Sequence, residues 1–66
     1  MPVAVHLDQV LIDRDMTLTE LSDAVGITMA NLSILKTGKA RAIRFSTLEA
    51  LCEVLDCQPG DLLSFE

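Results

Sequence analysis

The chain has no tryptophan and no tyrosine, and its only aromatic residues are two phenylalanines among 66 residues. Half of the residues are nevertheless hydrophobic, so any core is expected to consist of aliphatic side chains. A chain of this length forms at most one domain, and we expect residues 1–66 to be that domain. Such a small domain buries only about 60% of the surface of its unfolded chain, so pairing with a second copy would add burial.

Long apolar runs are also missing. No stretch of about 18 apolar residues occurs, so no transmembrane helix and no membrane partner are expected. The first residues, Met1–His6, lack the basic start and the apolar run of a signal peptide. These absences predict a cytoplasmic protein.

Residues that bind metals or carry out covalent catalysis are scarce. The chain has two cysteines, Cys52 and Cys57, and one histidine, His6. A zinc site needs about four nitrogen or sulfur ligands, so we expect no metal and no cofactor. The cysteines are expected to be unpaired thiols in a reducing compartment, and His6 to be exposed near the start of a helix. No Ser/His/acid set or Cys/His pair falls in a catalytic motif, so the chain is not expected to be an enzyme.

One long stretch contains no acidic residue. The chain has ten acidic and five basic residues, for a net charge of -5. Between Ala24 and Leu48 there is no acid, yet four of the five bases lie there: Lys36, Lys39, Arg41 and Arg44. A small fold built from this chain is therefore expected to carry a positive face on a negative body, and such a face attracts phosphate. The alternative is that these bases form an ordinary solvated surface.

Apolar residues at helical spacing predict five helices, over Leu7–Arg14, Leu18–Val25, Met29–Lys36 or Thr37, Ser46–Leu55, and Pro59–Leu62 or Leu63. Capping boxes are predicted at Thr17–Glu20 and Ser46–Glu49, and Thr28 is the predicted N-cap of the third helix. Gly26 would end the second helix with positive φ. A basic loop is expected over Lys39–Phe45.

The second and third predicted helices have apolar residues that would face each other across the Gly26 turn: Leu21, Val25, Ile27, Leu32 and Leu35. Two short helices can cross steeply if the turn residue tolerates unusual backbone angles and apolar side chains meet inside the angle. This is the helix-turn-helix arrangement, in which the second helix enters the major groove of DNA.

The stretch LTELSDAVGITMANLSILKTGK at residues 18–39, with STLEALC at 46–52 and CQPGDLL at 57–63, resembles the Xre/Cro-type helix-turn-helix family of bacterial and phage repressors. The resemblance extends over roughly residues 6 to 65, with the helix-turn-helix core at about 18–38. It implies an all-α, compact five-helix, lambda-repressor-like domain that binds double-stranded DNA, usually as a homodimer. The basic loop is similar to that of a subgroup of small stand-alone regulators. Residues Val3–Val5 would form either a short strand, paired with one at Leu63–Phe65, or only an extended arm.

The residues of the third helix that face DNA follow from helical geometry. With Leu32 and Leu35 turned inward at about 100° per residue, the predicted base contacts are Thr28, Met29, Ala30, Asn31, Ser33, Ile34 and Thr37. The predicted phosphate contacts are Lys36, Lys39, Arg41 and Arg44, together with Thr17 and Thr19, which the resemblance implies. Many family members have a glutamine near the start of this helix, which this chain lacks, so the base code is not inherited.

Two of these residues have other interpretations. Ile34 would contact a thymine methyl group, pack under the loop against Ile43 or Phe45, or lie in a protein interface. Asn31 would contact a base edge or be only a polar residue in the helix.

The sequence therefore predicts a sequence-specific DNA-binding transcriptional regulator, a repressor that binds its operator as a dimer. The alternative is a protein-interaction module with the same fold, such as an antitoxin-like or antirepressor partner. The net acidity and the apolar residues Ile34, Ile43 and Phe65 fit that alternative.

Overall fold

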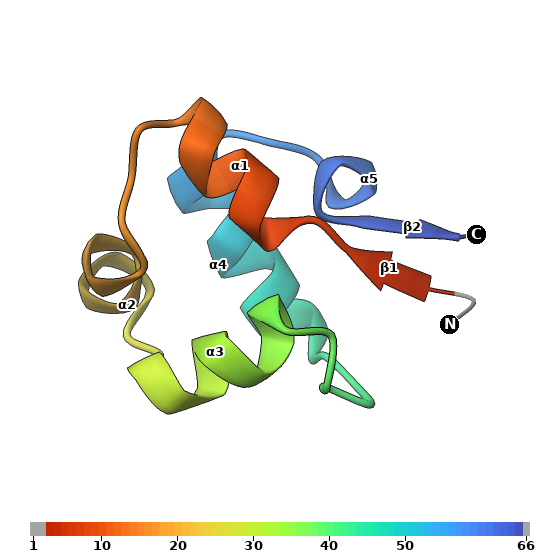
Figure 1. The fold of residues 1–66 in the computed structure, drawn as a ribbon. Coiled ribbons are helices and arrows are strands. Elements are labelled where there is room, and N and C mark those ends of the chain that lie inside the picture. Colours follow the sequence, from red (N-terminus) through yellow and green to blue (C-terminus); the bar gives the residue numbers. More distant parts are fainter. Residues whose placement is uncertain (1–2, 66) are drawn as a thin grey trace.

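The computed structural model describes residues 3–65, which form five helices and two short strands (Figure 1). The elements follow one another as β1 (Val3–Val5), α1 (Leu7–Asp13), α2 (Leu18–Val25), α3 (Met29–Lys36), α4 (Phe45–Leu55), α5 (Pro59–Leu62) and β2 (Leu63–Phe65). The expected helical domain with terminal strands is confirmed. Met1, Pro2 and Glu66, which the domain prediction includes, lie outside the described residues.

The two ends of the described chain pair as an antiparallel ribbon. Val3 lies opposite Phe65 and Val5 lies opposite Leu63. Because side chains alternate along a strand, these four apolar residues share one face of the ribbon. The ribbon projects from one end of the helical body (Figure 1).

His6 joins the ribbon to α1. Its backbone N–H donates to the carbonyl oxygen of Leu62 at 2.7 Å, and its ring Nε2 lies 2.6 Å from Oγ of Ser64. The expectation that His6 is exposed is therefore wrong. It is half-buried, because the C-terminal strand returns over the start of α1.

The start of α2 and the turn into α3 form as predicted. The Thr17 hydroxyl accepts from the Glu20 N–H at 3.1 Å, and the Glu20 carboxylate accepts from the Thr17 N–H at 3.0 Å. Gly26 ends α2 with φ of 72°. The Ser22 hydroxyl donates to the carbonyl oxygen of Ile27 at 2.6 Å and so ties the turn back to α2.

The start of α4 differs from the prediction. The helix begins at Phe45, with Arg44 as an N-cap in extended backbone conformation and without a side-chain cap. The capping box expected at Ser46–Glu49 does not form, because Ser46 already lies inside the first turn. The first hydrogen bond of the helix runs from the Leu48 N–H to the carbonyl oxygen of Arg44 at 3.0 Å, which places the helix start before Ser46.

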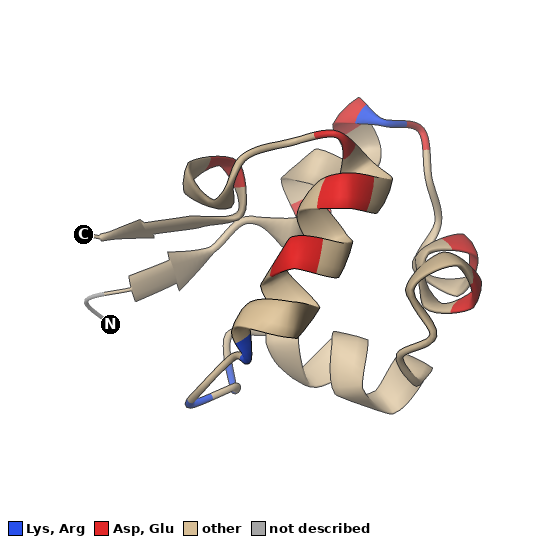
Figure 2. Ribbon diagram, turned by 180° about the vertical axis from the view of Figure 1, so that it is seen from behind, with Lys and Arg blue, Asp and Glu red and all other residues tan. Residues whose placement is uncertain are grey.

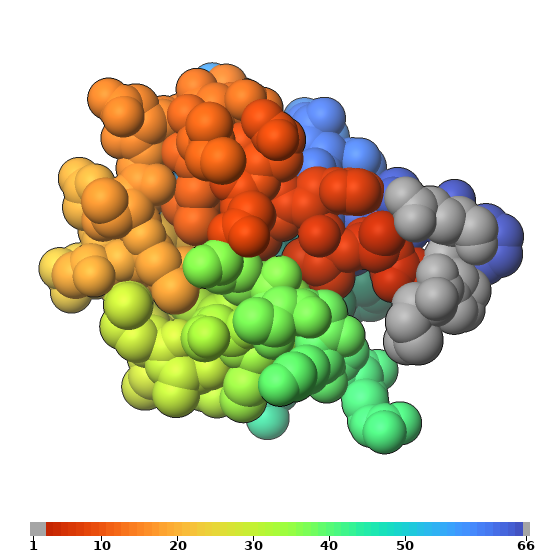
Figure 3. Space-filling view, viewed as in Figure 1, coloured from red at the N-terminus to blue at the C-terminus, as the bar shows by residue number. Residues whose placement is uncertain are grey.

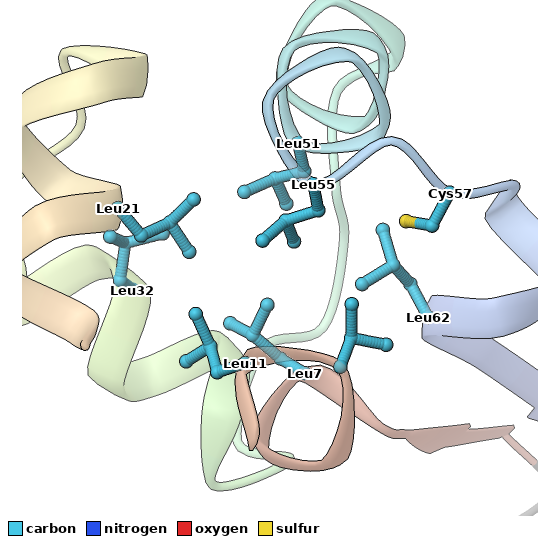
Figure 4. Packing of buried hydrophobic residues seen from close by; sticks show 9 residues of the cluster. Leu7, Leu11, Leu21, Leu32, Leu51, Leu55, Cys57 and Leu62 are labelled. Atoms are coloured by element: carbon cyan, nitrogen blue, oxygen red, sulfur yellow. The ribbon is translucent and has the colours of Figure 1, made fainter. Parts of the chain in front are cut away.

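Leucines contributed by α1 to α5 meet in the core (Figure 4). The residues exposed by at most 1% are Leu7, Leu21, Leu32, Leu51 and Leu55. Val25, Ile27 and Leu35 are half-buried and pack against this cluster. The predicted apolar contact between α2 and α3 is thus confirmed, and it holds α3 across the end of α2.

Gly26 and Gly60 provide a matched test of the turn. A Cβ atom at either position would meet no atom within 4 Å, but only Gly26 of the two has positive φ. Gly26→Ala should lower the free energy of unfolding by about 1–2 kcal/mol, because a side chain strains left-handed backbone. Gly60→Ala, in a helix, should maintain or raise it. Urea denaturation followed by circular dichroism measures both values, and equal effects would contradict the role given to Gly26.

Candidate nucleic-acid interface

One face of helix α3 packs into the core, and the rest of the helix surface is exposed to solvent. Leu32 is 1% exposed and Leu35 is half-buried. All the predicted base-contact residues are exposed: Thr28, Met29, Ala30, Asn31, Ser33, Ile34 and Thr37. The outer face of α3 therefore presents polar and apolar side chains but no charged one.

The hydroxyl groups on this face differ in what they can offer a ligand. Thr28 Oγ1 accepts from the Asn31 N–H at 3.2 Å, so its own O–H is still able to donate. Thr37 Oγ1 already donates within the helix, to the carbonyl oxygens of Ser33 at 2.9 Å and Ile34 at 3.2 Å. Thr37 would thus meet DNA as an acceptor or through its methyl group.

Thr17 and Thr19 lie exposed at the start of α2. The Thr17 hydroxyl accepts a hydrogen bond in the capping box and keeps its proton for donation. The Glu20 carboxylate in the same turn is bonded to the Thr17 N–H, which places a negative charge beside these two threonines. The predicted phosphate contact at this point would therefore depend on hydroxyl donors and not on local positive charge.

The four bases of the acid-free stretch divide into two kinds. Lys39, Arg41 and Arg44 are exposed in the loop between α3 and α4. Lys36, at the last turn of α3, is half-buried, and its Nζ lies 3.5 Å from Oδ1 of Asp8 on α1. The sequence separates Lys36 and Asp8 widely, so this pair could not be predicted from charge spacing.

Arg14 has a structural role that the sequence did not reveal. Its Nε donates to the carbonyl oxygen of Leu55 at 2.6 Å, and its second terminal nitrogen donates to that of Asp56 at 2.8 Å. Arg14 therefore satisfies backbone acceptors at the C-terminal end of α4, where a positive charge is also favourable. The expected helix end at Arg14 shifts to Asp13, since Arg14 is the C-cap of α1.

A shallow groove of about 640 Å³ is lined by residues of both α3 and the basic loop. Its lining includes Thr28, Asn31 and Ile34 from the helix segment and Lys39, Arg41 and Arg44 from the loop. In the space-filling view, α3 and the loop form one continuous surface along the lower side (Figure 3). Three candidate base contacts and three candidate phosphate contacts thus share one groove. The other candidate residues lie outside its lining: Met29, Ala30, Ser33, Thr37, Lys36, Thr17 and Thr19.

Charge is divided between two sides of the molecule (Figure 2). Blue segments gather at the loop beside α3, whereas the acidic residues lie over α1, α2, α4 and α5, with Arg14 as the base among them. This is the positive face on a negative body that the sequence predicts. The loop bases are therefore not scattered over opposite sides.

The structure narrows the interpretations of Ile34. Its side chain lines the groove together with Ile43, and it remains 47% exposed. Phe45 is 84% exposed and does not enclose it. Ile34 is thus partly packed beside the loop and still accessible to a ligand.

Comparison with known proteins agrees with this geometry. Residues 6–66 match the family of Cro/C1-type HTH DNA-binding domains. The chain therefore belongs to this Xre/Cro-type helix-turn-helix family, which is a type of DNA-binding regulator and not a class of enzyme. It is also 62% identical over 65 residues to YozG of Bacillus subtilis (strain 168), described as an uncharacterized HTH-type transcriptional regulator. That match covers 98% of this chain and 77% of the relative.

Two further properties of the described residues concern other classes of site. No helix within residues 3–65 has the length and hydropathy needed to cross a membrane. No cluster of three or more His, Cys, Asp or Glu side chains suited to a metal ion occurs in the same part of the chain.

Arg14 and Lys39 allow the structural and DNA-facing bases to be distinguished. Arg14→Gln should lower the free energy of unfolding by about 1–2 kcal/mol, because two charge-assisted hydrogen bonds are lost at a partly solvated site. Lys39→Gln removes the same charge from an exposed loop and should change stability by less than about 0.5 kcal/mol. Chemical denaturation measures both. Equal losses would show that the guanidinium of Arg14 does not stabilise the end of α4.

Proposed function

We propose that this protein is a sequence-specific transcriptional repressor that binds its operator in double-stranded DNA as a homodimer. The observation that carries the proposal is the shared groove, in which the uncharged outer face of α3 adjoins Lys39, Arg41 and Arg44. The description of its relative as a transcriptional regulator supports a regulatory role. Repression requires only that the bound protein occupies the promoter.

On this proposal, α3 lies in the major groove and selects the sequence. Asn31 and Ser33 hydrogen-bond to base edges, while Met29, Ala30 and Ile34 contact thymine methyl groups. These side chains are short or uncharged, so they discriminate between bases without adding general affinity for DNA.

The loop supplies the affinity. Lys39, Arg41 and Arg44 bind phosphates and fix the position of α3 on the duplex. Lys36 joins them when DNA is bound, since an exposed ion pair such as that with Asp8 stabilises by at most about 1 kcal/mol. Thr17 and Thr19 bind phosphate from the N-terminal end of α2, which crosses the DNA backbone.

The two groups of residues should respond differently to substitution. Duplexes selected from a random library provide the specific probe, and a scrambled duplex provides the non-specific one. Replacing Lys39 and Arg41 by alanine should weaken binding to both duplexes, because a homodimer loses four phosphate contacts. The salt slope should become shallower by about 3.6, at about 0.9 for each contact, from roughly -7 for the eight basic contacts of the unmodified dimer. Ser33→Ala should reduce the preference between the duplexes and leave the salt slope unchanged.

Fluorescence anisotropy over a range of salt concentrations measures these quantities. Arg14→Gln is the control, because it removes a positive charge outside the proposed interface and should leave the salt slope unchanged. If Lys39, Arg41 and Ser33 variants had the same effect on both duplexes, the division between phosphate and base contacts would be wrong.

The ribbon is the surface that we propose for dimerisation. Val3 is 51% exposed and Phe65 is 81% exposed, and no charged side chain lies on β1 or β2. A groove of about 660 Å³ adjoins this face. Its apolar lining comes from the ribbon, Leu35 and Ile43, and the loop bases Lys39 and Arg41 also line it. The molecule is 29 Å long. A dimer joined at the ribbon end would need to place its two α3 helices about 34 Å apart to reach successive major grooves.

A second copy is the proposed occupant because operators with two half-sites require a two-fold partner at such a spacing. Replacing Phe65 by Asp should shift the protein toward monomer in sedimentation velocity, since a charge would be buried at the interface. Phe45→Asp is the matched control, because Phe45 is about as exposed as Phe65 but belongs to α4 and not to the ribbon. An unchanged dimer in the Phe65 variant would exclude the ribbon as the interface.

A protein-interaction module is the second candidate function, and the exposed side chains of Phe45 and Ile12 favour it. Gel retardation at low salt separates the two candidates. A DNA-binding protein binds even a non-specific duplex under those conditions and slows its migration, whereas a pure interaction module does not.

A further inference from the structure

The end of α4 contains an arrangement that the proposed DNA binding does not use. Asp56 leaves the helix in left-handed conformation, with φ of 51° and ψ of 55°. The N–H of Cys57 then turns back to the carbonyl oxygen of Cys52 at 3.0 Å. This is the six-to-one hydrogen bond of a Schellman motif.

A Schellman motif commonly brings the side chains at its two ends into contact. Here both of those side chains are cysteines, and the Cys52 side chain lies near enough to the Cys57 thiol to raise its pKa. A disulfide requires Cα atoms about 4.4–6.8 Å apart and Cβ atoms facing each other. The backbone hydrogen bond from Cys57 to Cys52 holds the two residues in the arrangement that brings these side chains together.

Both cysteine side chains are largely shielded from solvent, but neither is completely enclosed. Cys57 is 9% exposed, and its sulfur points into the core cluster (Figure 4). The same residue lines a shallow groove of about 370 Å³ between α1 and α5, beside Arg14 and Asp61. Cys52 is half-buried. An oxidant of the size of a water molecule can therefore approach the pair.

The two thiols differ in exposure, and burial affects the pKa of Cys57. Burial, and next the neighbouring Cys52, raise the pKa of the Cys57 thiol above its ordinary value. Cys57 thus remains protonated at neutral pH and is a poor first nucleophile. The more accessible Cys52 is the better candidate to meet an oxidant first.

We propose that Cys52 and Cys57 form a dithiol site that hydrogen peroxide converts reversibly to an intrachain disulfide. The Cys52 sulfur attacks one peroxide oxygen, the O–O bond breaks, and Cys52 sulfenic acid and one water are produced. The Cys57 sulfur then attacks the Cys52 sulfur, the S–O bond breaks, and the Cys57 proton leaves with the oxygen in a second water. The two thiols together give up two electrons, and a small dithiol reductant returns them.

The place of the pair in the fold determines what the disulfide changes. The end of α4 lies at the opposite side of the molecule from α3 (Figure 1). Oxidation should therefore stabilise the junction between α4 and α5 without altering the surface proposed for DNA. This inference does not rest on the proposed function.

The test is limited peroxide treatment of the full chain, followed by alkylation with iodoacetamide and intact mass measurement under denaturing conditions. The unmodified protein should lose two hydrogen atoms and take up no alkyl group, and dithiothreitol should restore two alkylation sites. Cys52→Ser and Cys57→Ser should each be unable to lose two hydrogens within one chain. The Cys52→Ala, Cys57→Ala double variant is the control for oxidation of methionine.

Thermal unfolding provides an independent measurement. Oxidation should raise Tm of the unmodified protein by roughly 5 °C or more, and leave Tm of the double variant unchanged. Two alkylated thiols after peroxide treatment, a disulfide between chains on a non-reducing gel, or sulfinic acid at Cys52 without a disulfide would each overturn the proposal. A disulfide that lowers Tm would show that the thiol geometry is strained, and would overturn it as well.

Discussion

Apolar packing on the inner side of α3 is the constraint on which the remaining structure depends. An isolated helix shorter than about 12–15 residues is marginal in water, and α3 has 8 residues. The Thr28 cap stabilises α3 by about 1 kcal/mol, which is not enough to make so short a helix stable on its own. Burial of Leu32 against Leu21 and the leucines of α4 therefore both forms the helix and sets its direction. The exposed face is available only because the opposite face is occupied.

Features that depend on near neighbours in the chain could be predicted from the sequence. The bounds of α2 and α3, the Thr17 capping box and the left-handed Gly26 each involve residues within a few positions of one another. The exposed face of α3 was also predictable, because the period of a helix relates it directly to the buried Leu32. The family, now shown by the match over residues 6–66, could be recognised from the same local patterns.

Features that depend on tertiary contact could not be predicted. Arg14 reaches acceptors 41 and 42 residues away, and His6 contacts Ser64 across 58 residues. Nothing in local spacing distinguishes Arg14 from a solvated base, or Lys36 from the loop lysine. The start of α4 was misplaced, because the capping pattern at Ser46 suggested a later start than the one set by the hydrogen bond from Leu48 to Arg44. Which exposed residues contact DNA, and whether the domain functions as a single unit, stay predictions.

The separation of charge from the outer face of α3 has a consequence for how such a protein can evolve. On the proposed assignment, general attraction to nucleic acid would come from a short irregular segment, and discrimination between sequences would come from the uncharged outer face of a helix. Substitutions on that face would then redirect the protein to new target sites without altering how long it stays on the rest of the genome. Loss or gain of a loop base would instead change how much protein a cell needs to occupy an unchanged target.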